Sequence, residues 1–158
     1  MSKFLHFDIN MTGQCNLRCT YCTEAGNDYS PKNCDAIIPS MIVFFDRVLQ
    51  SDLMKQYDGL CINFWGGEPT LKTDSIIELV EHFQNNPKVR FMLYTNGFKF
   101  TSKLKEKLLE LKDKRIDKFT AKFHTQISYD GYRVHNLKRL TVASTSERSG
   151  VWPPCPSI

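Results

Sequence analysis

The sequence has no apolar stretch that approaches the roughly 20 residues a transmembrane helix needs. Its first ten residues include His6 and Asp8 and have no basic segment leading into an apolar run, so we expect no secretory signal. These two absences predict a cytoplasmic protein. In that compartment we expect the six cysteines to be thiols or metal ligands rather than disulfides, because cytosolic reductants keep thiols reduced.

The sequence also lacks internal repeats, and its 158 residues fit a single domain. The formal net charge is only +4, and it comes largely from the stretch between Lys99 and Lys118. We interpret that stretch as the solvated face of a helix rather than a surface for nucleic acid or a membrane. From Thr141 onward Ser, Thr, Arg, Gly and Pro replace the apolar periodicity, which predicts a folded core over 1–140 and a flexible tail over 141–158.

Alternating apolar and polar residues predict four strands, near 5–11, 60–64, 89–95 and 119–128. Between them, helical spacing of apolar residues predicts three helices, with apolar stripes over 42–53, 76–83 and 104–111. We expect the first helix to begin near Pro39, and Thr73 or Asp74 to cap the second. Strands that alternate with helices predict an α/β fold with a parallel sheet. Each candidate motif follows a strand, at the sheet edge where such folds place their active sites.

The polar residues of the expected strands predict a second surface on the sheet. If the apolar side chains pack on the helices, then the alternating polar ones face the opposite side. They are His6, Asp8, Asn10, Asn63, His124, Gln126 and Ser128. In a sheet curved into a partial barrel this side is a wet, substrate-holding lumen, and on an open sheet it faces solvent.

Three cysteines, Cys15, Cys19 and Cys22, lie within eight residues directly after the first expected strand. A [4Fe–4S] cluster normally takes four thiolates, so three local ligands leave one iron open for chemistry. A structural zinc site completed by Cys34 or by a histidine is the alternative. Zinc sites more often use paired Cys-x-x-Cys units, which this chain lacks, so the spacing favours an iron–sulfur cluster.

Three further motifs follow the other expected strands. Trp65-Gly66-Gly67-Glu68-Pro69 offers glycines that let a ligand approach the backbone and a carboxylate that can accept from an ammonium group. Asn96-Gly97 ends the third strand, and the segment from Ser128 to Gly131 ends the fourth. Taken singly, each of these motifs is more often a tight turn.

Together these motifs resemble the radical S-adenosylmethionine (SAM) superfamily. Cys-x3-Cys-x-aromatic-Cys, with Tyr21 as the aromatic residue, is similar to its cluster-binding signature, and the Gly-Gly-Glu-Pro run is similar to its SAM-binding motif. Ser-x-Asp-Gly followed by Arg139 resembles the peptide-modifying members, among them the sulfatase-maturating enzymes, although Asn136 stands where those usually have Asp. The resemblance implies a partial (β/α) barrel, a [4Fe–4S] cluster, SAM, and a 5′-deoxyadenosyl radical that abstracts hydrogen, with a peptide or protein as the expected substrate.

The resemblance also implies roles for individual residues. Cys15, Cys19 and Cys22 would ligate the cluster, and Gly66, Gly67 and Glu68 would hold the methionine end of SAM. The remaining assignments are Tyr21 near the cluster or the adenine, Asn96 and Ser128 in the SAM pocket, Asp130 as either a pocket or a turn residue, and Arg139 beside the SAM carboxylate. A reducing electron donor such as flavodoxin or ferredoxin is implied as a partner.

The resemblance ends near Arg139, after four strands, whereas the superfamily usually builds six βα units. Unpaired edge backbone invites a completing subunit or self-association. The chain could therefore be a minimal enzyme, a subunit of a complex or a shortened product. A non-catalytic iron–sulfur binding module remains the alternative from a different functional class.

Overall fold

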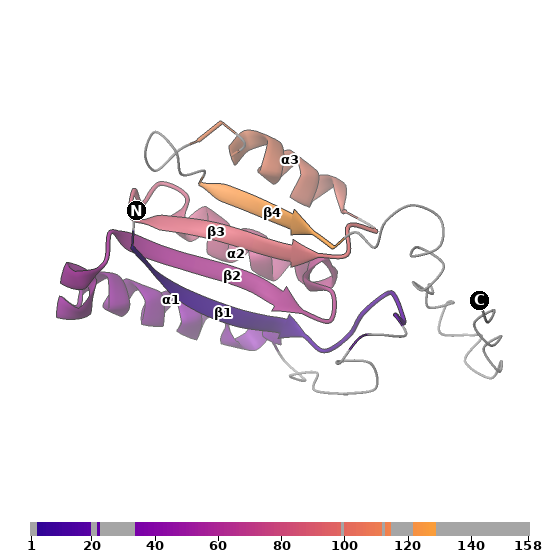
Figure 1. The fold of residues 1–158 in the computed structure, drawn as a ribbon, viewed down its shortest axis with the longest axis horizontal. Helices are drawn as coiled ribbons and strands as arrows, with labels where there is room; N and C mark the ends of the chain where they lie inside the picture. Colours follow the sequence, from indigo (N-terminus) through magenta and orange to yellow (C-terminus); the bar gives the residue numbers. More distant parts are fainter. Residues whose placement is uncertain are drawn as a thin grey trace.

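The computed structural model describes residues 3–19, 22, 34–98, 100–111, 113–114 and 122–128. Within them, four parallel strands form one sheet in the order β1, β2, β3, β4 (Figure 1). The strands are β1 (Phe4–Thr12), β2 (Gly59–Gly66), β3 (Val89–Thr95) and β4 (Phe123–Ile127). Each strand pairs with the next along the chain, which is the commoner arrangement of consecutive βα units.

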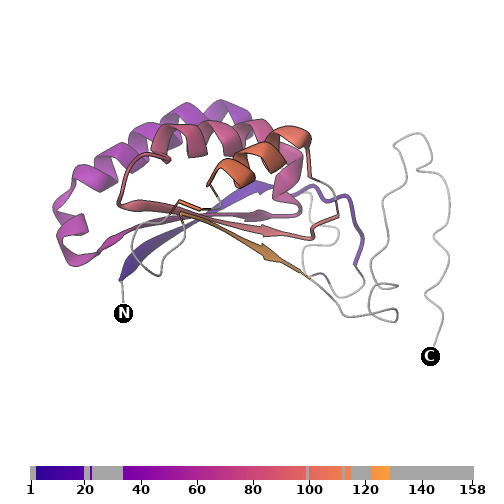
Figure 2. The same cartoon turned by 90° about the horizontal axis from the view of Figure 1, so that it is seen from above.

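Three helices, α1 (Cys34–Gln50), α2 (Thr73–Phe83) and α3 (Ser102–Leu111), cover the same face of the sheet (Figure 2). Two short 3-10 helices, η1 (Asp52–Gln56) and η2 (Pro69–Lys72), lie in the connections around β2. This arrangement confirms the predicted α/β class, with four parallel strands and flanking helices. None of the described helices is both long and apolar enough to cross a membrane.

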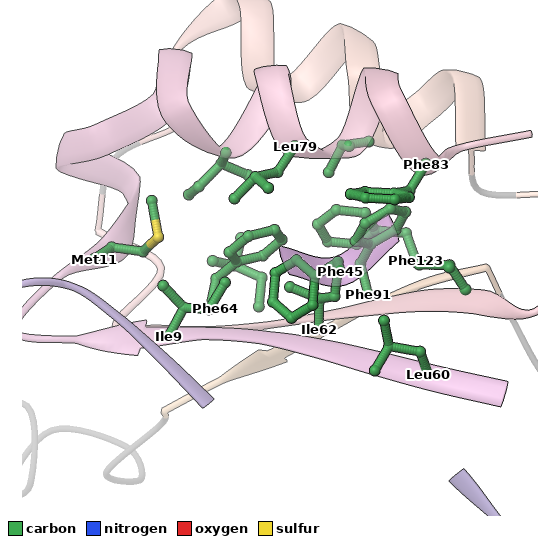
Figure 3. Close-up of a cluster of buried hydrophobic side chains, with 14 of the residues drawn as sticks. Ile9, Met11, Phe45, Leu60, Ile62, Phe64, Leu79, Phe83, Phe91 and Phe123 are labelled. Atoms are coloured by element: carbon green, nitrogen blue, oxygen red, sulfur yellow. The ribbon is translucent and has the colours of Figure 1, made fainter. Parts of the chain in front are cut away.

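The hydrophobic core fills the layer between the helices and the sheet (Figure 3). Ile62, Phe64 and Phe91 from the strands meet Leu79 and Phe83 from α2, and all five are at most 1% exposed. Burying a large apolar side chain contributes about 1.5–3 kcal/mol, so this layer is the main stabilising element. The strand residues in it are those that the alternation pattern assigns to the helix side.

The first helix begins five residues before the predicted start. Pro39 lies inside α1 rather than at its beginning, although proline has no N–H to donate to the carbonyl of Asp35. The first turn is held by tertiary contacts instead, because Asp35 accepts hydrogen bonds from Lys72 Nζ at 2.8 Å and Ser75 Oγ at 2.5 Å. These contacts also lower the pKa of the Asp35 carboxyl.

Two other local predictions, the end of the first helix and the cap of the second, were wrong. Leu53 was expected on the first helix, but α1 ends at Gln50 and Leu53 lies in η1 with 42% of its surface exposed. Neither Thr73 nor Asp74 caps α2: Thr73 is the first helical residue, and its hydroxyl donates to the Thr70 carbonyl. The predicted start of the fourth strand and the tail over 141–158 lie outside the described residues.

The face of the sheet opposite the helices is polar, as the alternation predicts. His6, Asp8, His124 and Gln126 are exposed, and the described helices all lie on the other face of the sheet (Figure 2). Asn10 and Asn63 are exceptions: Asn10 is only partly exposed, and Asn63, at 3% exposed, donates to Asp8 Oδ1 at 2.6 Å. The candidate motifs lie at the edge of this face, where the strands have their carboxyl ends.

Candidate cofactor site

The carboxyl ends of the four strands surround an open cavity of about 570 Å³. This volume falls within the roughly 300–1,000 Å³ typical of small-molecule sites. Seven residues predicted from the sequence line it together: Cys15, Cys19, Cys22, Gly66, Gly67, Asn96 and Ser128. Tyr21, Asp130 and Arg139 lie outside the described residues.

The loop that carries the cysteines is joined to the end of β2 by backbone hydrogen bonds. Thr12 pairs with Gly66 in the β1–β2 register. Beyond it, the Gly67 N–H donates to the Thr12 carbonyl at 2.7 Å, and the Glu68 N–H donates to the Gln14 carbonyl at 2.8 Å. The two sequence motifs are therefore parts of one structure, although about forty residues separate them in the chain.

The two glycines are required by the chain itself. Gly66 has a φ of +128°, and a Cβ there would lie 2.5 Å from the Thr12 carbonyl oxygen. A Cβ on Gly67 would collide with the Gln14 backbone. From the sequence, we expected these glycines to let a ligand approach the backbone. In the structure, their lack of a side chain also makes room for the backbone at the start of the cysteine loop.

Glu68 lies behind the cavity and is 1% exposed. Its Oε1 accepts hydrogen bonds from the Thr70 N–H at 3.1 Å, the Thr70 hydroxyl at 2.7 Å and the Thr95 hydroxyl at 2.6 Å. Its Oε2 accepts from the Asn96 N–H at 2.8 Å. The carboxylate therefore connects the ends of β2 and β3. The contact of Glu68 with the amino group of SAM stays a prediction.

Asn96 reaches from the end of β3 to the cysteine loop. Its Nδ2 lies 2.8 Å from Asn16 Oδ1 and 3.6 Å from the sulfur of Cys15, which also accepts from the Leu17 N–H at 3.4 Å. Burial raises the pKa of the Cys15 thiol, the two donors oppose that rise, and the Glu68 charge adds to it. Cys15 is thus a half-buried sulfur with hydrogen-bond donors directed at it.

The chemistry of the three thiols fits an iron–sulfur cluster. Cys15 and Cys19 are half-buried, Cys22 is exposed, and all three face one cavity. No three Cys, His, Asp or Glu side chains in the described part of the chain gather as ligands of a single metal ion. A cube binds each thiolate at a different iron, so its ligands are spread more widely than those of zinc. The residues present fit the cluster.

Two aromatic residues of the cavity were not singled out from the sequence as site residues. Trp65 on β2 and Tyr94 on β3 are 40% and 37% exposed and line the cavity. Asp8, Leu17 and Thr95 line it as well. The available signal was the alternation pattern, which places Trp65 and Tyr94 on the face away from the helices, at the strand ends.

The fold and the site define an α/β protein with a cysteine-lined cavity at the carboxyl ends of its parallel strands. Residues 9–125 match the model of the Radical SAM superfamily. The chain belongs to this superfamily, as its motifs predicted. Membership supports the two expected cofactors, a [4Fe–4S] cluster and SAM.

Curated relatives are named GTP 3′,8-cyclase. The Haemophilus influenzae (strain 86-028NP) protein is 31% identical over 98 residues, which are 61% of this chain and 27% of that protein. The Clostridium perfringens (strain SM101) protein is 28% identical over 144 residues, which are 89% of this chain and 39% of that protein. The chain therefore spans well under half the length of these relatives.

Solved structures with the same fold are described as native anSMEcpe with bound AdoMet, which is SAM. One is 28% identical with a TM-score of 0.59 and covers 86% of this chain and 35% of that chain. Another, with bound AdoMet and Kp18Cys peptide, is 29% identical with a TM-score of 0.61. The similarity extends over most of this chain and about a third of the solved one.

Proposed function

We propose that this chain binds a [4Fe–4S] cluster through Cys15, Cys19 and Cys22 and binds SAM in the adjoining cavity. The observation that supports the proposal most strongly is the convergence of the three thiols with Gly66, Gly67, Asn96 and Ser128 on one cavity. When bound, the cluster supplies the electron that cleaves SAM to a 5′-deoxyadenosyl radical, which abstracts a hydrogen atom from the substrate.

The residues of the chain contribute binding, orientation and electrostatics. Gly66 and Gly67 expose backbone to the cavity, and the methionine end of SAM is proposed to lie against them. Asn96 and Ser128 form the wall on the side of β3 and β4. The carboxylate of Glu68 holds the strand ends that carry these groups, and its contact with the amino group of SAM stays a proposal. Roles for Tyr21, Asp130 and Arg139 stay predictions.

A peptide or protein side chain is the proposed substrate class. The support is the Ser128 motif together with the similarity to a solved structure with bound AdoMet and Kp18Cys peptide. Cyclisation of a purine nucleotide is the second candidate, favoured by the names of the curated relatives. Flavodoxin or ferredoxin as electron donor, a completing subunit or a second copy, and a cytoplasmic location remain predictions.

The test of the proposed function is SAM cleavage by anaerobically reconstituted protein. We expect 5′-deoxyadenosine, separated by liquid chromatography, after addition of a strong reductant, and none from a Cys19→Ala variant treated in the same way. A loaded cluster without cleavage would support the non-catalytic module instead. Zinc without iron in anaerobically purified protein would support the structural zinc domain.

A further inference from the structure

We propose that Asn96 raises the reduction potential of the cluster by donating a side-chain hydrogen bond to the sulfur of Cys15. The inference rests on the proposed function, because it needs a cluster bound at Cys15. It assigns Asn96 a positioning and electrostatic role toward a cluster ligand, in addition to its place in the cavity wall.

The carboxamide of Asn96 has the donors that this role needs. Its Nδ2 carries two hydrogens, and it donates to Asn16 Oδ1 at 2.8 Å and to Cys15 Sγ at 3.6 Å. One N–H group can therefore point to each acceptor at the same time. The Leu17 N–H at 3.4 Å is a second donor to the same sulfur.

The orientation of the carboxamide follows from its other contacts. Asn96 Oδ1 accepts from the Phe98 N–H at 2.9 Å, so the oxygen faces the turn and the nitrogen faces Cys15. An inverted carboxamide would place its oxygen against Asn16 Oδ1 and its NH2 group against a backbone donor. The Asn96 N–H is itself held by the buried carboxylate of Glu68 at 2.8 Å. The donor is thus positioned before any cofactor binds.

The consequence for the cluster is electrostatic. A hydrogen bond to a charged acceptor is stronger than one to a neutral acceptor, so the contact strengthens when Cys15 becomes a thiolate. Reduction adds negative charge to the cluster and its sulfurs, and a donor stabilises that charge. Hydrogen bonds to sulfur are among the factors that set cluster potentials. Removing the donor should therefore shift the reduction potential to a lower value.

The experiment is an anaerobic redox titration of the reconstituted full chain, without SAM, followed by electron paramagnetic resonance. Asn96→Asp keeps an oxygen for the Phe98 N–H and loses the donor to Cys15. Asn96→Ala and Asn96→Ser also lose that donor without adding charge, and the serine hydroxyl can still accept from the Phe98 N–H. Iron content and circular dichroism identify the variants that are folded and loaded.

The matched control is Asn86→Asp. Asn86 lies between α2 and β3, at the other end of the sheet, and its Oδ1 accepts from the Lys88 N–H at 2.9 Å. The same substitution there keeps that acceptor and changes the net charge equally. We expect the Asn86→Asp protein to keep the wild-type potential.

The expected result is a lower potential in Asn96→Asp and in each loaded neutral variant, with the control unchanged. A shift in Asn96→Asp alone, with wild-type potentials in Asn96→Ala and Asn96→Ser, would mean that charge rather than the hydrogen bond acts, and would overturn the inference. Wild-type potentials in all Asn96 variants that carry the cluster would overturn the inference too, while leaving the proposed function intact. A wild-type chain that binds no cluster would overturn both.

Discussion

Replacing Glu68 with alanine tests whether a buried carboxylate holds the site together. Glu68 is 1% exposed and accepts from two hydroxyls and from the backbone N–H groups of Thr70 and Asn96. The hydroxyls can rotate to other acceptors, whereas the two N–H groups lose theirs, at about 1–3 kcal/mol each. Glu68→Ala should therefore lower the free energy of unfolding by about 2–6 kcal/mol, a large share of the roughly 5–15 kcal/mol typical of a domain.

The assay is urea unfolding of the cluster-free protein, followed by far-ultraviolet circular dichroism. If the slope with denaturant is unchanged, the shift of the midpoint measures the change in stability. Glu78→Ala is the matched control, because Glu78 is exposed on α2 and should change stability by no more than about 0.5 kcal/mol. Equal midpoints for Glu68→Ala and Glu78→Ala would refute the role given to the buried carboxylate.

Three further substitutions give separate tests. Gly67→Ala places a methyl group against the Gln14 backbone and should destabilise the protein by about 1–3 kcal/mol in the same urea assay; wild-type stability would contradict the tight approach. Cys19→Ala should abolish the absorbance at about 400 nm of the reconstituted protein, and retained colour would count against this ligand. Burial, with a smaller contribution from the Lys114 charge, lowers the pKa of Lys122 to about 8 from 10.5. Since the unfolded chain holds this proton up to about 10.5, the contribution of Lys122 to stability should increase from pH 8 to 10.5. Lys122→Met should remove this contribution, so urea midpoints plotted against pH should have a less positive slope than in the wild type.

Local sequence patterns were sufficient for the sheet and for the position of the motifs. Alternation in segments such as 60–64 identified the strands and their buried sides, because a sheet packed on one face alternates between core and open side chains. Parallel order then places every strand end at one edge, so residues as distant as Cys15 and Asn96 were expected at a common site. That expectation required no knowledge of individual contacts.

Contacts between distant segments were beyond the sequence patterns. Position 67 requires glycine because the carbonyl of Gln14 lies too close for a Cβ atom. This close contact depends on the register of β1 against β2. The start of α1 depends on Asp35 meeting Lys72 and Ser75, which overrides the local rule that proline begins a helix. The contacts of Glu68 with Thr95 and Asn96 on the β3 side likewise become known only once the strands are paired.

Cluster binding by the three cysteines is tested most directly by the iron and acid-labile sulfide content of anaerobically purified and reconstituted protein, measured together with Mössbauer spectra. We expect iron and sulfide in the stoichiometry and with the spectrum of a [4Fe–4S] cluster, and their loss when Cys15, Cys19 and Cys22 are all replaced by alanine. Colourless protein without sulfide, or an equal cluster content in the triple variant, would contradict it.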